Sequence, residues 1–529
     1  MNKKLVIPVI VIVTVLGVFL GMKIQSAMSD DKVSDQVKKY NEVLSLTSRY
    51  YVDNVDTPKL TESAIKGMLE ELDPHSVYIS SDQLKRVNEE FQGSFEGIGV
   101  EFDIVNDTLT VVSPITGGPS EKLGVLAGDK IVKIDGQSCI KISREDVPKK
   151  LRGQKGTKVV IIVVRGGMRE PIEFEITRDK IPLYSVDASF MLNNEAGYVK
   201  VSRFAATTYD EFSQAINKLK GQGMKMMILD LRSNPGGYLD QAFKMASEFI
   251  PGGKRIVYTK SRIKEFEEVY NSTGGPSQNI PLIVLVNEGS ASASEIVSGA
   301  VQDWDRGLIV GETTFGKGLV QRQFDLSDGS ALRVTTARYY TPSGRLIQKP
   351  YVGGKYKDGM RIDTLEGDNI QHEREGDTSR PVFKTFGGRT VYGGGGITPD
   401  YFVKLDTLTN YTVQLRRLNL IYESAEKWMK DNRKSVESKY PNYIAYRDGF
   451  SVSDGMLDEL ISMAKSRGVE FNSYGFEKDR PFLMTAIKAQ IARDIWGNEG
   501  FYAVFMSSDD QVTKALSLFG EAIKLAGLK

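Results

Sequence analysis

Apolar positions recur every three or four residues from residue 30 to about residue 95, which is the spacing of helices that bury one face. A first helix is followed by a second one that begins after Pro58. We interpret this region as a packing or dimerisation unit without a chemical role. Its periodic positions include Val37, Tyr40, Val43 and Leu44 in the first helix and Ala64, Ile65, Met68 and Leu69 in the second.

Between residues 96 and 178 the pattern changes to short apolar runs separated by glycines, which is typical of strands joined by tight turns. The runs include Leu109–Val112, Lys130–Ile134 and Val159–Val164. A glycine-rich loop, Gly97–Val100, leads directly into another predicted strand, Glu101–Ile104. We therefore predict a small β-rich domain.

After Ile181 predicted strands alternate with predicted helices. Two strands, Met226–Leu229 and Leu282–Val286, are apolar throughout, as expected for a sheet covered on both faces. This region is therefore predicted to be an α/β core. Its elements are strands at Gly197–Val201, Met224–Leu231 and Pro281–Val286 and helices at Tyr209–Lys220, Asp240–Phe249 and Ala293–Trp304.

The remaining segments carry weaker signals. Residues 351–396 are rich in Gly, Asp and Lys and are predicted to form a long surface loop. Helical spacing returns from about Thr407 to Lys529, and we assign that part no chemistry. The expected division is an amino-terminal segment, a helical region, a β-rich domain, a core and a helical tail. The corresponding residues are 1–24, 25–95, 96–180, 181–405 and 406–529.

The chain begins with Lys3 and Lys4 ahead of an apolar run from Leu5 to Met22. This run is short for a membrane-spanning helix but long for a cleaved signal, so we favour an uncleaved anchor. Cleavage near Gln25–Ala27 is the alternative. In both cases the rest of the chain is expected outside the cytoplasm, in the periplasm and tethered to the inner membrane if the anchor is retained.

Composition argues against several functions. The 69 basic and 68 acidic side chains nearly cancel, which disfavours nucleic-acid binding. Cys139 is the only cysteine, and the two histidines, His75 and His372, lack neighbouring ligands at metal-binding spacing. We expect no metal site and no cofactor.

Three short segments carry residues suited to acyl-transfer chemistry. In the first, Asn287–Glu295, Ser292 follows a buried strand and opens a helix. The amide groups and the dipole at a helix amino terminus stabilise negative charge that develops beside a nucleophilic hydroxyl. The alternative is structural, because Ser292 and Glu295 can form a capping box.

The second segment, Gly311–Gln321, sets Lys317 between two glycines. A free lysine has a pKa of about 10.4, but burial lowers it by up to about 3–5 units, so that a neutral amine is available as a base. Gln321 lies four positions on and, in a strand, projects from the same side to hold that amine. The alternative is a solvated surface lysine.

The third segment, Asp230–Gly237, ends a buried strand. The amide of Gly236 or Gly237, together with that of Ala293, is a candidate to bind the oxyanion of a tetrahedral intermediate. The alternative is a strand-ending turn without a chemical role. The two histidines fall in the helical region and in the glycine-rich loop, so neither is expected to act as the base.

Taken together, these residues resemble the carboxyl-terminal processing proteases, also called tail-specific proteases. The matching segments occur in the family's order, and the separation of Ser292 from Lys317, 317 − 292 = 25, agrees with that family. This spacing selects Ser292 over the neighbouring candidates Ser290 and Ser294. The resemblance covers about Asp30 to Asp400. The matching segments are Gly97–Val100, Asp230–Gly237, Ser290–Glu295, Gly316–Gly318 with Gln321, Ala337–Gly344 and Gly396–Asp400.

The resemblance implies a crotonase-like α/β protease core with an inserted PDZ domain. It implies that Ser292 attacks the scissile carbonyl, that Lys317 transfers the proton and that Gln321 orients Lys317. It also implies that a loop of the PDZ domain binds a substrate's free carboxylate while the adjoining strand pairs with the peptide, and that the position of this domain gates activity. The implied partners are proteins with free carboxyl-terminal tails. The apolar amino-terminal segment adds the membrane as a partner, and the helical region adds a second copy of the chain if it serves dimerisation. The carboxylate-binding amides would be those of Gly97, Ile98, Gly99 and Val100.

Two other functions remain open from the sequence. One is a peptide-binding scaffold with a catalytically silent core, which the presence of Ser292, Lys317 and Gln321 disfavours. The other is acyl transfer with coenzyme A on a crotonase-type core, which the expected export and the peptide-binding domain disfavour.

Overall fold

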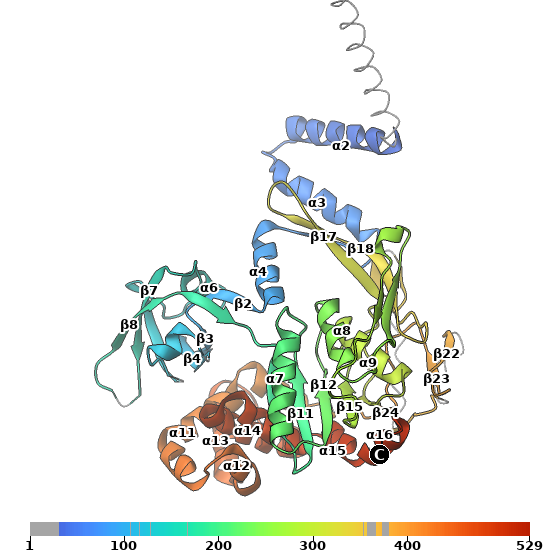
Figure 1. The fold of residues 1–529 in the computed structure, drawn as a ribbon. Helices are drawn as coiled ribbons and strands as arrows, with labels where there is room; N and C mark the ends of the chain where they lie inside the picture. Colours follow the sequence, from blue (N-terminus) through green and yellow to red (C-terminus); the bar gives the residue numbers. More distant parts are fainter. Residues whose placement is uncertain are drawn as a thin grey trace, which may run out of the picture.

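The computed structural model describes residues 31–528 except 106, 116, 127, 167, 353, 357–366 and 373–379. The predicted membrane segment, residues 1–24, lies outside the described residues. Within the described part, no helix combines the length and the apolar character that crossing a membrane requires. Figure 1 shows the β-rich domain beside the α/β core, with tail helices beneath both and two amino-terminal helices extending from the top.

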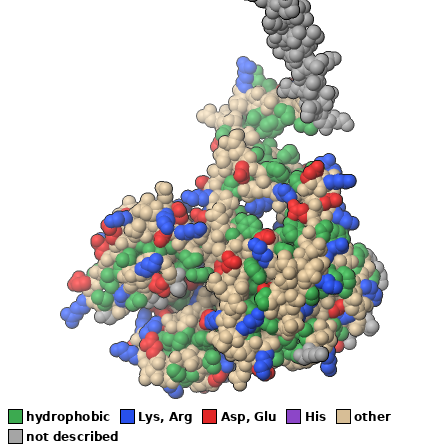
Figure 2. Space-filling model, in the orientation of Figure 1, with side chains coloured by type: hydrophobic (Ala, Val, Ile, Leu, Met, Phe, Trp, Pro, Cys, Tyr) green, Lys and Arg blue, Asp and Glu red, His purple; other side chains and the backbone are tan. Residues whose placement is uncertain are grey.

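The amino-terminal region is helical, as predicted. Helix α2 leaves its apolar residues uncovered, since Val37 and Val43 keep 53% and 56% of their surface exposed. Elsewhere on the molecule, basic and acidic side chains are mixed over the face seen in Figure 2, in keeping with the balanced charge of the sequence. The helices are α2 (Asp31–Tyr50), α3 (Thr57–Glu70) and α4 (Ser81–Gln92).

The β-rich domain is one sheet of order β3–β4–β5–β7–β8, with the short strand β6 paired to β5. Strand β3 is an edge strand, and helix α6 packs its buried residues Val147 and Leu151 into the same small core. The two connections to the rest of the chain, β2 (Ser94–Gly97) and β9 (Asp179–Pro182), pair with each other. The predicted strands are confirmed. The bounds are β3 (Val100–Val105), β4 (Thr108–Pro114), α5 (Pro119–Lys122), β5 (Lys130–Ile134), β6 (Gln137–Ser138), α6 (Asp146–Leu151), β7 (Lys158–Val164) and β8 (Ile172–Thr177).

The α/β core is built on a sheet of order β10–β11–β12–β15–β16–β24–β21, in which the strands from β11 to β24 run parallel. Helices α7, α8 and α9 cover one face of this sheet. The predicted alternation of strands and helices is confirmed. The bounds are β10 (Val186–Met191), β11 (Ala196–Val201), α7 (Thr208–Gly221), β12 (Met226–Asp230), α8 (Leu239–Ser247), β15 (Leu282–Val286), α9 (Ala293–Asp303), β16 (Leu308–Gly311), β21 (Gly367–Asp368) and β24 (Tyr401–Phe402).

The end of the helical tail covers the opposite face of the sheet. There the strand residues Tyr198, Ile228 and Ile283 pack in one cluster with Val512 and Phe519 of the tail. The earlier tail helices form a separate apolar core of their own. The tail is helical as predicted, and its last helices complete the core. The bounds are α10 (Asn410–Arg417), α11 (Leu420–Lys439), α12 (Tyr443–Gly449), α13 (Asp454–Ser466), α14 (Ser473–Phe505), α15 (Asp510–Ser517) and α16 (Phe519–Leu525).

A second, antiparallel sheet joins the amino-terminal region to the core. Its central strand, β18, pairs with β17, β13 and also with β1, which lies between helices α3 and α4. Residues that are distant in sequence therefore meet along β18. The bounds are β1 (Val77–Ile79), β13 (Arg255–Lys260), β14 (Val269–Asn271), β17 (Leu319–Asp325) and β18 (Ala331–Tyr340).

The prediction that residues 351–396 form a surface loop is wrong for the residues that the structure describes there. Arg389 is 6% exposed and pairs with the buried carboxylates of Asp305 and Asp400, each at 2.6 Å. His372 is buried beside Asp400. Glycines indicate turns, but they give no sign of the ion pairs that hold those turns against the core. The short strands are β19 (Tyr351–Val352), β20 (Lys355–Tyr356), β22 (Val382–Lys384) and β23 (Thr390–Tyr392).

A buried ion cluster ties the tail to the end of β12. Asp230 accepts hydrogen bonds from Lys200 at 3.1 Å and Arg232 at 2.6 Å. The Tyr198 hydroxyl also donates to Asp230, at 2.6 Å. Burial acts to raise the pKa of Asp230, but the charges of Arg232 and Lys200 outweigh it and hold that pKa well below its usual range. Arg232 also binds Asp509, at 2.8 Å, and thereby joins β12 to the start of α15.

Replacing Arg232 with alanine is expected to destabilise the protein by about 3–5 kcal/mol, because Asp230 and Asp509 would stay buried without their main partner. Urea unfolding of the full chain measures this loss. Lys225→Ala, which removes an exposed ion pair with Glu195, is the control and should leave the unfolding midpoint unchanged. A wild-type midpoint in Arg232→Ala would contradict the proposed strength of the cluster.

Candidate active site

The structure separates the three candidate serines at the start of α9. Ser290 is fully buried and donates to the Leu231 carbonyl at 2.8 Å. Ser294 is also fully buried and donates to the Asn234 carbonyl at 2.9 Å. Ser292 is partly exposed, between two buried alanines. Of the three hydroxyls, that of Ser292 is therefore the one a substrate can reach.

The backbone of Ser292 is strained. Its φ of 54° and ψ of −109° lie outside the regions that a serine favours, at a cost of roughly 1–3 kcal/mol. Ser292 also occupies the position before the first turn of α9, where the free N–H groups of the helix lie. A strained serine at a helix amino terminus is typical of a nucleophile held in one orientation.

Glu295 connects the serine loop to the lysine loop. Its carboxylate has no exposed surface and accepts hydrogen bonds from the N–H groups of Ser292 at 2.8 Å and Lys317 at 2.9 Å. It also accepts from the N–H of Gly316 at 2.7 Å and from the Thr314 hydroxyl at 2.6 Å. Burial raises the pKa of Glu295 to about 7, although these four donors favour the charged form.

Lys317 lies between two glycines that approach other backbone segments closely. A Cβ atom on Gly316 would lie 3.0 Å from the Gly396 nitrogen, and one on Gly318 would lie 3.0 Å from the Gln348 nitrogen. The Lys317 side chain is largely enclosed, and burial lowers its pKa. The positive charge of Arg333 lowers it further, whereas the carboxylates of Glu295 and Asp73 oppose the shift.

The side chains of Ser292 and Lys317 do not hydrogen-bond to each other within the part of the chain that the structure describes. Their link is through Glu295, which binds the main-chain N–H of both. Direct contact between a nucleophile and its base is often loose in a protein without substrate and tightens when substrate binds. The structure therefore brings the two loops together around one carboxylate.

Gln321 belongs to a hydrogen-bond chain that reaches the amino-terminal region. Its side-chain nitrogen donates to the Thr335 hydroxyl at 3.2 Å, across the pair β17–β18. The Thr335 hydroxyl in turn donates to Asp73 at 3.0 Å. Asp73 is buried and also accepts from the Ser76 hydroxyl at 2.6 Å. The amide of Gln321 is thus fixed by a segment about 250 residues earlier in the chain.

The amino-terminal helical region, which we interpreted as a packing unit without a chemical role, reaches the site through its His75 and Asp73. His75, in the turn between α3 and β1, lies close enough to Lys317 for its charge to affect the His75 pKa. Burial, then the charge of Lys317, lower that pKa to about 4, against the opposing charge of Asp73. His75 hydrogen-bonds to the Tyr356 hydroxyl, which occupies Nε2.

The two glycines proposed for the oxyanion site differ in the structure. The N–H of Gly236 donates to the Asn234 side chain at 2.9 Å, so it is already engaged. No hydrogen bond engages the N–H of Gly237 or of Ala293 among the described residues, and Ala293 is the first residue of α9. A Cβ on Gly236 would lie 2.8 Å from that of Ser292, so glycine is required for this close approach. The pair Gly237 and Ala293 therefore fits an oxyanion better than a pair with Gly236.

The glycine-rich loop, Gly97–Val100, connects β2 to β3. Ile98 is buried, and its carbonyl accepts from the Ser120 hydroxyl at 2.6 Å, which fixes the loop. Gly99 has a φ of 74°. In the described chain, the N–H groups of Ile98 and Gly99 donate to no other backbone carbonyl. They are therefore available to an external acceptor such as a carboxylate.

Sequence reasoning missed the main supporting residues. It treated Glu295 only as a helix cap, although its place three residues after Ser292 was visible. It did not identify Asp73 or Thr335, which act through contacts between distant segments. The described residues contain no group of three or more side chains suited to a metal ion.

Residues 195–356, which carry Ser292 and Lys317, match Peptidase family S41. Residues 110–165 match the PDZ domain, and residues 20–83 match the N-terminal domain of the activating protease CtpB. Residues 411–497, in the helical tail, match a family of unknown function, DUF8443. The matches define a serine-type peptidase with a PDZ domain, which is the β-rich domain described above.

The chain belongs to the carboxy-terminal processing protease family. It is 38% identical over 349 residues to a carboxy-terminal-processing protease of Bartonella bacilliformis, covering 64% of this chain and 80% of the relative. It is 37% identical over 368 residues to the carboxy-terminal processing protease CtpA of Bacillus subtilis, covering 69% and 77%. A solved structure, the photosystem II D1 C-terminal processing protease, is 28% identical over 70% of this chain and 93% of that chain, with a TM-score of 0.36.

Glu295→Gln is expected to lower kcat/KM by at least about 100-fold without unfolding the protein, because the new amide group must face two N–H or O–H donors. In the wild type, Glu295 gains a proton as the pH falls through about 7, so activity should fall there, and the variant should lose this dependence. Glu288→Gln, at an exposed position in the loop before α9, is the matched control. Peptidase assays from pH 5 to 9 make the comparison, and equal activity of the two variants would contradict it.

Proposed function

We propose that this protein is an endopeptidase that recognises the free carboxyl-terminal tails of exported proteins through its PDZ domain and hydrolyses them with Ser292 and Lys317. The observation that carries this proposal is the buried Glu295 carboxylate, which binds the backbone of both residues. The lowered pKa of Lys317 supports its role as a base.

In the proposed first step, the Ser292 oxygen attacks the scissile carbonyl carbon and the neutral amine of Lys317 takes the hydroxyl proton. The negative charge passes to the carbonyl oxygen. The N–H groups of Gly237 and Ala293 bind this oxyanion, and the amino end of α9 adds its favourable dipole.

In the second step the carbon–nitrogen bond breaks, and the Lys317 ammonium gives its proton to the departing amine. An ester between Ser292 and the substrate remains. Water then attacks this ester, passes a proton to Lys317, and the serine regains its hydroxyl proton as the acid product leaves. The side-chain oxygen of Gln321 accepts a hydrogen bond from Lys317 throughout, while its nitrogen is held by Thr335.

Several finer features belong to the same proposal. The core is crotonase-like, the residues after about 24 lie outside the cytoplasm, and residues 1–24 tether the chain to the inner membrane.

The uncovered apolar side chains of α2 support a homo-oligomer in which a second copy covers them. Size measurement of residues 31–528 with and without Val37→Lys and Val43→Lys tests that arrangement.

Ser292→Ala and Lys317→Ala are each expected to reduce cleavage of a protein with an unstructured apolar tail by more than about 1,000-fold. The wild type should gain activity as the pH rises through the Lys317 pKa, because only the neutral amine accepts a proton. This limb should lie below the pKa of about 10.4 of a free lysine. Lys264→Ala, at an exposed lysine, should cleave like the wild type. Activity of Lys317→Ala near neutral pH would refute the proposed base.

Asp73→Asn is expected to shift to lower pH the rise of kcat/KM that follows loss of the proton from Lys317. The charge of Asp73 raises the Lys317 pKa, so its removal lets the amine lose its proton at a lower pH. Thr335→Val keeps all charges but loses the contact to Gln321, so it should lower kcat without moving the limb. Asp82→Asn, at an exposed site on α4, is the control. An unmoved limb in Asp73→Asn would contradict this role.

A further inference from the structure

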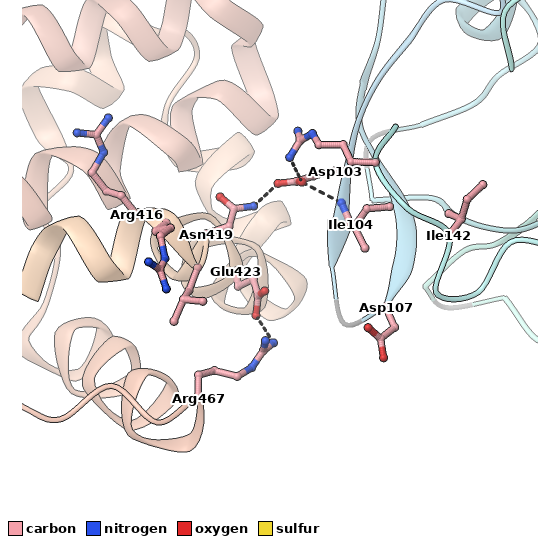
Figure 3. Close-up of a pocket in the computed structure, with 11 residues that line it drawn as sticks. Asp103, Ile104, Asp107, Ile142, Arg416, Asn419, Glu423 and Arg467 are labelled. Atoms are coloured by element: carbon pink, nitrogen blue, oxygen red, sulfur yellow. Dashed lines mark hydrogen bonds and ion pairs between the residues drawn. The ribbon is translucent and has the colours of Figure 1, made fainter. Parts of the chain in front are cut away.

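A cavity of about 820 Å³ lies between the PDZ domain and the helical tail. Figure 3 shows it with Asp103, Ile104 and Asp107 on the PDZ side and Arg416 and Asn419 on the tail side. It lies away from Ser292 and Lys317, neither of which lines it. The tail segment that lines it belongs to the part of the chain matching a family of unknown function.

The cavity continues the expected peptide groove. Strand β3 starts at the glycine-rich loop and pairs with β4 alone in the described sheet, so its other edge is open to an added strand. Ile104, near the far end of β3, and Asp107, in the turn after it, line the cavity. Ile142 and Arg144, which precede helix α6, also line it. A peptide antiparallel to β3, with its carboxylate at the loop, reaches this point roughly four to six residues before its end.

Two contacts hold the tail against β3. Arg493 of α14 pairs with Glu101 at 2.9 Å. Asn419, just before α11, donates to Asp103 at 2.5 Å. Asp103 also accepts from the N–H of Ile104 at 2.8 Å, so the edge of β3 is closed at this residue. An added peptide strand must therefore leave the edge near Asp103, where the cavity opens.

The charges that line the cavity are not balanced. Asp103 pairs with Arg144 at 3.0 Å, and Glu423 pairs with Arg467 at 2.9 Å. The remaining charged side chains are two arginines, Arg416 and Arg417, and one carboxylate, Asp107. Both arginines are exposed, and neither forms an ion pair within the described residues. The Arg416 guanidinium lies over the Phe482 ring, 5.9 Å from its centroid, a contact that keeps its positive charge. The cavity therefore favours an acidic side chain.

We propose that this cavity is a second recognition site for the substrate tail, in which Arg416 and Arg417 bind an acidic side chain about four to six residues before the free carboxylate. The proposal rests on the proposed capture of tails by the PDZ domain. It assigns the helical tail a part in substrate selection, because one wall of the site comes from each of the two regions.

Binding of labelled ten-residue peptides to the full chain carrying Ser292→Ala tests the proposal without turnover. The peptides share an apolar carboxyl end and carry Glu or Lys at the fifth residue from that end. Fluorescence anisotropy should give a Kd about three- to tenfold lower for the Glu peptide. Arg416→Glu with Arg417→Glu should abolish or reverse this preference while both peptides still bind.

Lys430→Glu with Lys434→Glu is the matched control, since both lysines are exposed on α11, do not line the cavity and give the same change of net charge. It should retain the preference for the Glu peptide. An equal loss of preference in both double variants would overturn the site, because the effect would then come from overall charge. Equal binding of the Glu and Lys peptides would also overturn it.

A peptide with an amidated carboxyl end separates this proposal from the proposed function. If the free-acid peptides bind and the amide does not, carboxylate capture stands, and the comparison of Glu with Lys decides the cavity's role alone. If the amide binds as tightly as the free acid, carboxylate capture itself fails, and the second site fails with it.

Discussion

A carboxylate without exposed surface is stable as an anion only when donors surround it, and Glu295 meets four of them. These donors come from the loop after β15 and from the loop that connects β16, in the same sheet, to β17 of the antiparallel sheet. One side chain thus joins the two loops, together with a backbone hydrogen bond from the Phe315 N–H to the Ser290 carbonyl at 3.0 Å. The strained backbone of Ser292 and the enclosed amine of Lys317 lie in the two loops that this carboxylate joins.

The elements that the sequence predicts well are those with local signals. A few neighbouring residues are enough to interpret these signals. They include the apolar strands at Met226–Leu229 and Leu282–Val286 and the small residues around Ser292. The choice of Ser292 over Ser290 and Ser294 rested on a family spacing. The structure gives an independent reason, because the other two hydroxyls are buried and donate to backbone carbonyls.

Features that join distant segments could not be predicted. Nothing near His75 in the sequence indicates that its turn packs beside Lys317, since that contact follows from the pairing of β1 with β18. The burial of Arg389 likewise depends on its ion pairs with Asp305 and Asp400. The glycine-rich composition of its segment does not indicate these pairs. The N–H of Gly236 is engaged by one hydrogen bond to the Asn234 side chain, and a sequence motif gives no sign of that bond.

One face of the central parallel sheet is covered by helices that are synthesised last. Its strand β16 ends at Gly311, but α15, which helps to close the second face, begins only at Asp510. At a ribosomal rate of about 5–20 residues per second, those roughly 200 residues take about 10–40 s. During that interval the apolar side chains of β11, β12 and β15 lack their cover. The nascent chain is then a natural client for chaperones, and it acquires a complete hydrophobic core only when its last helices emerge.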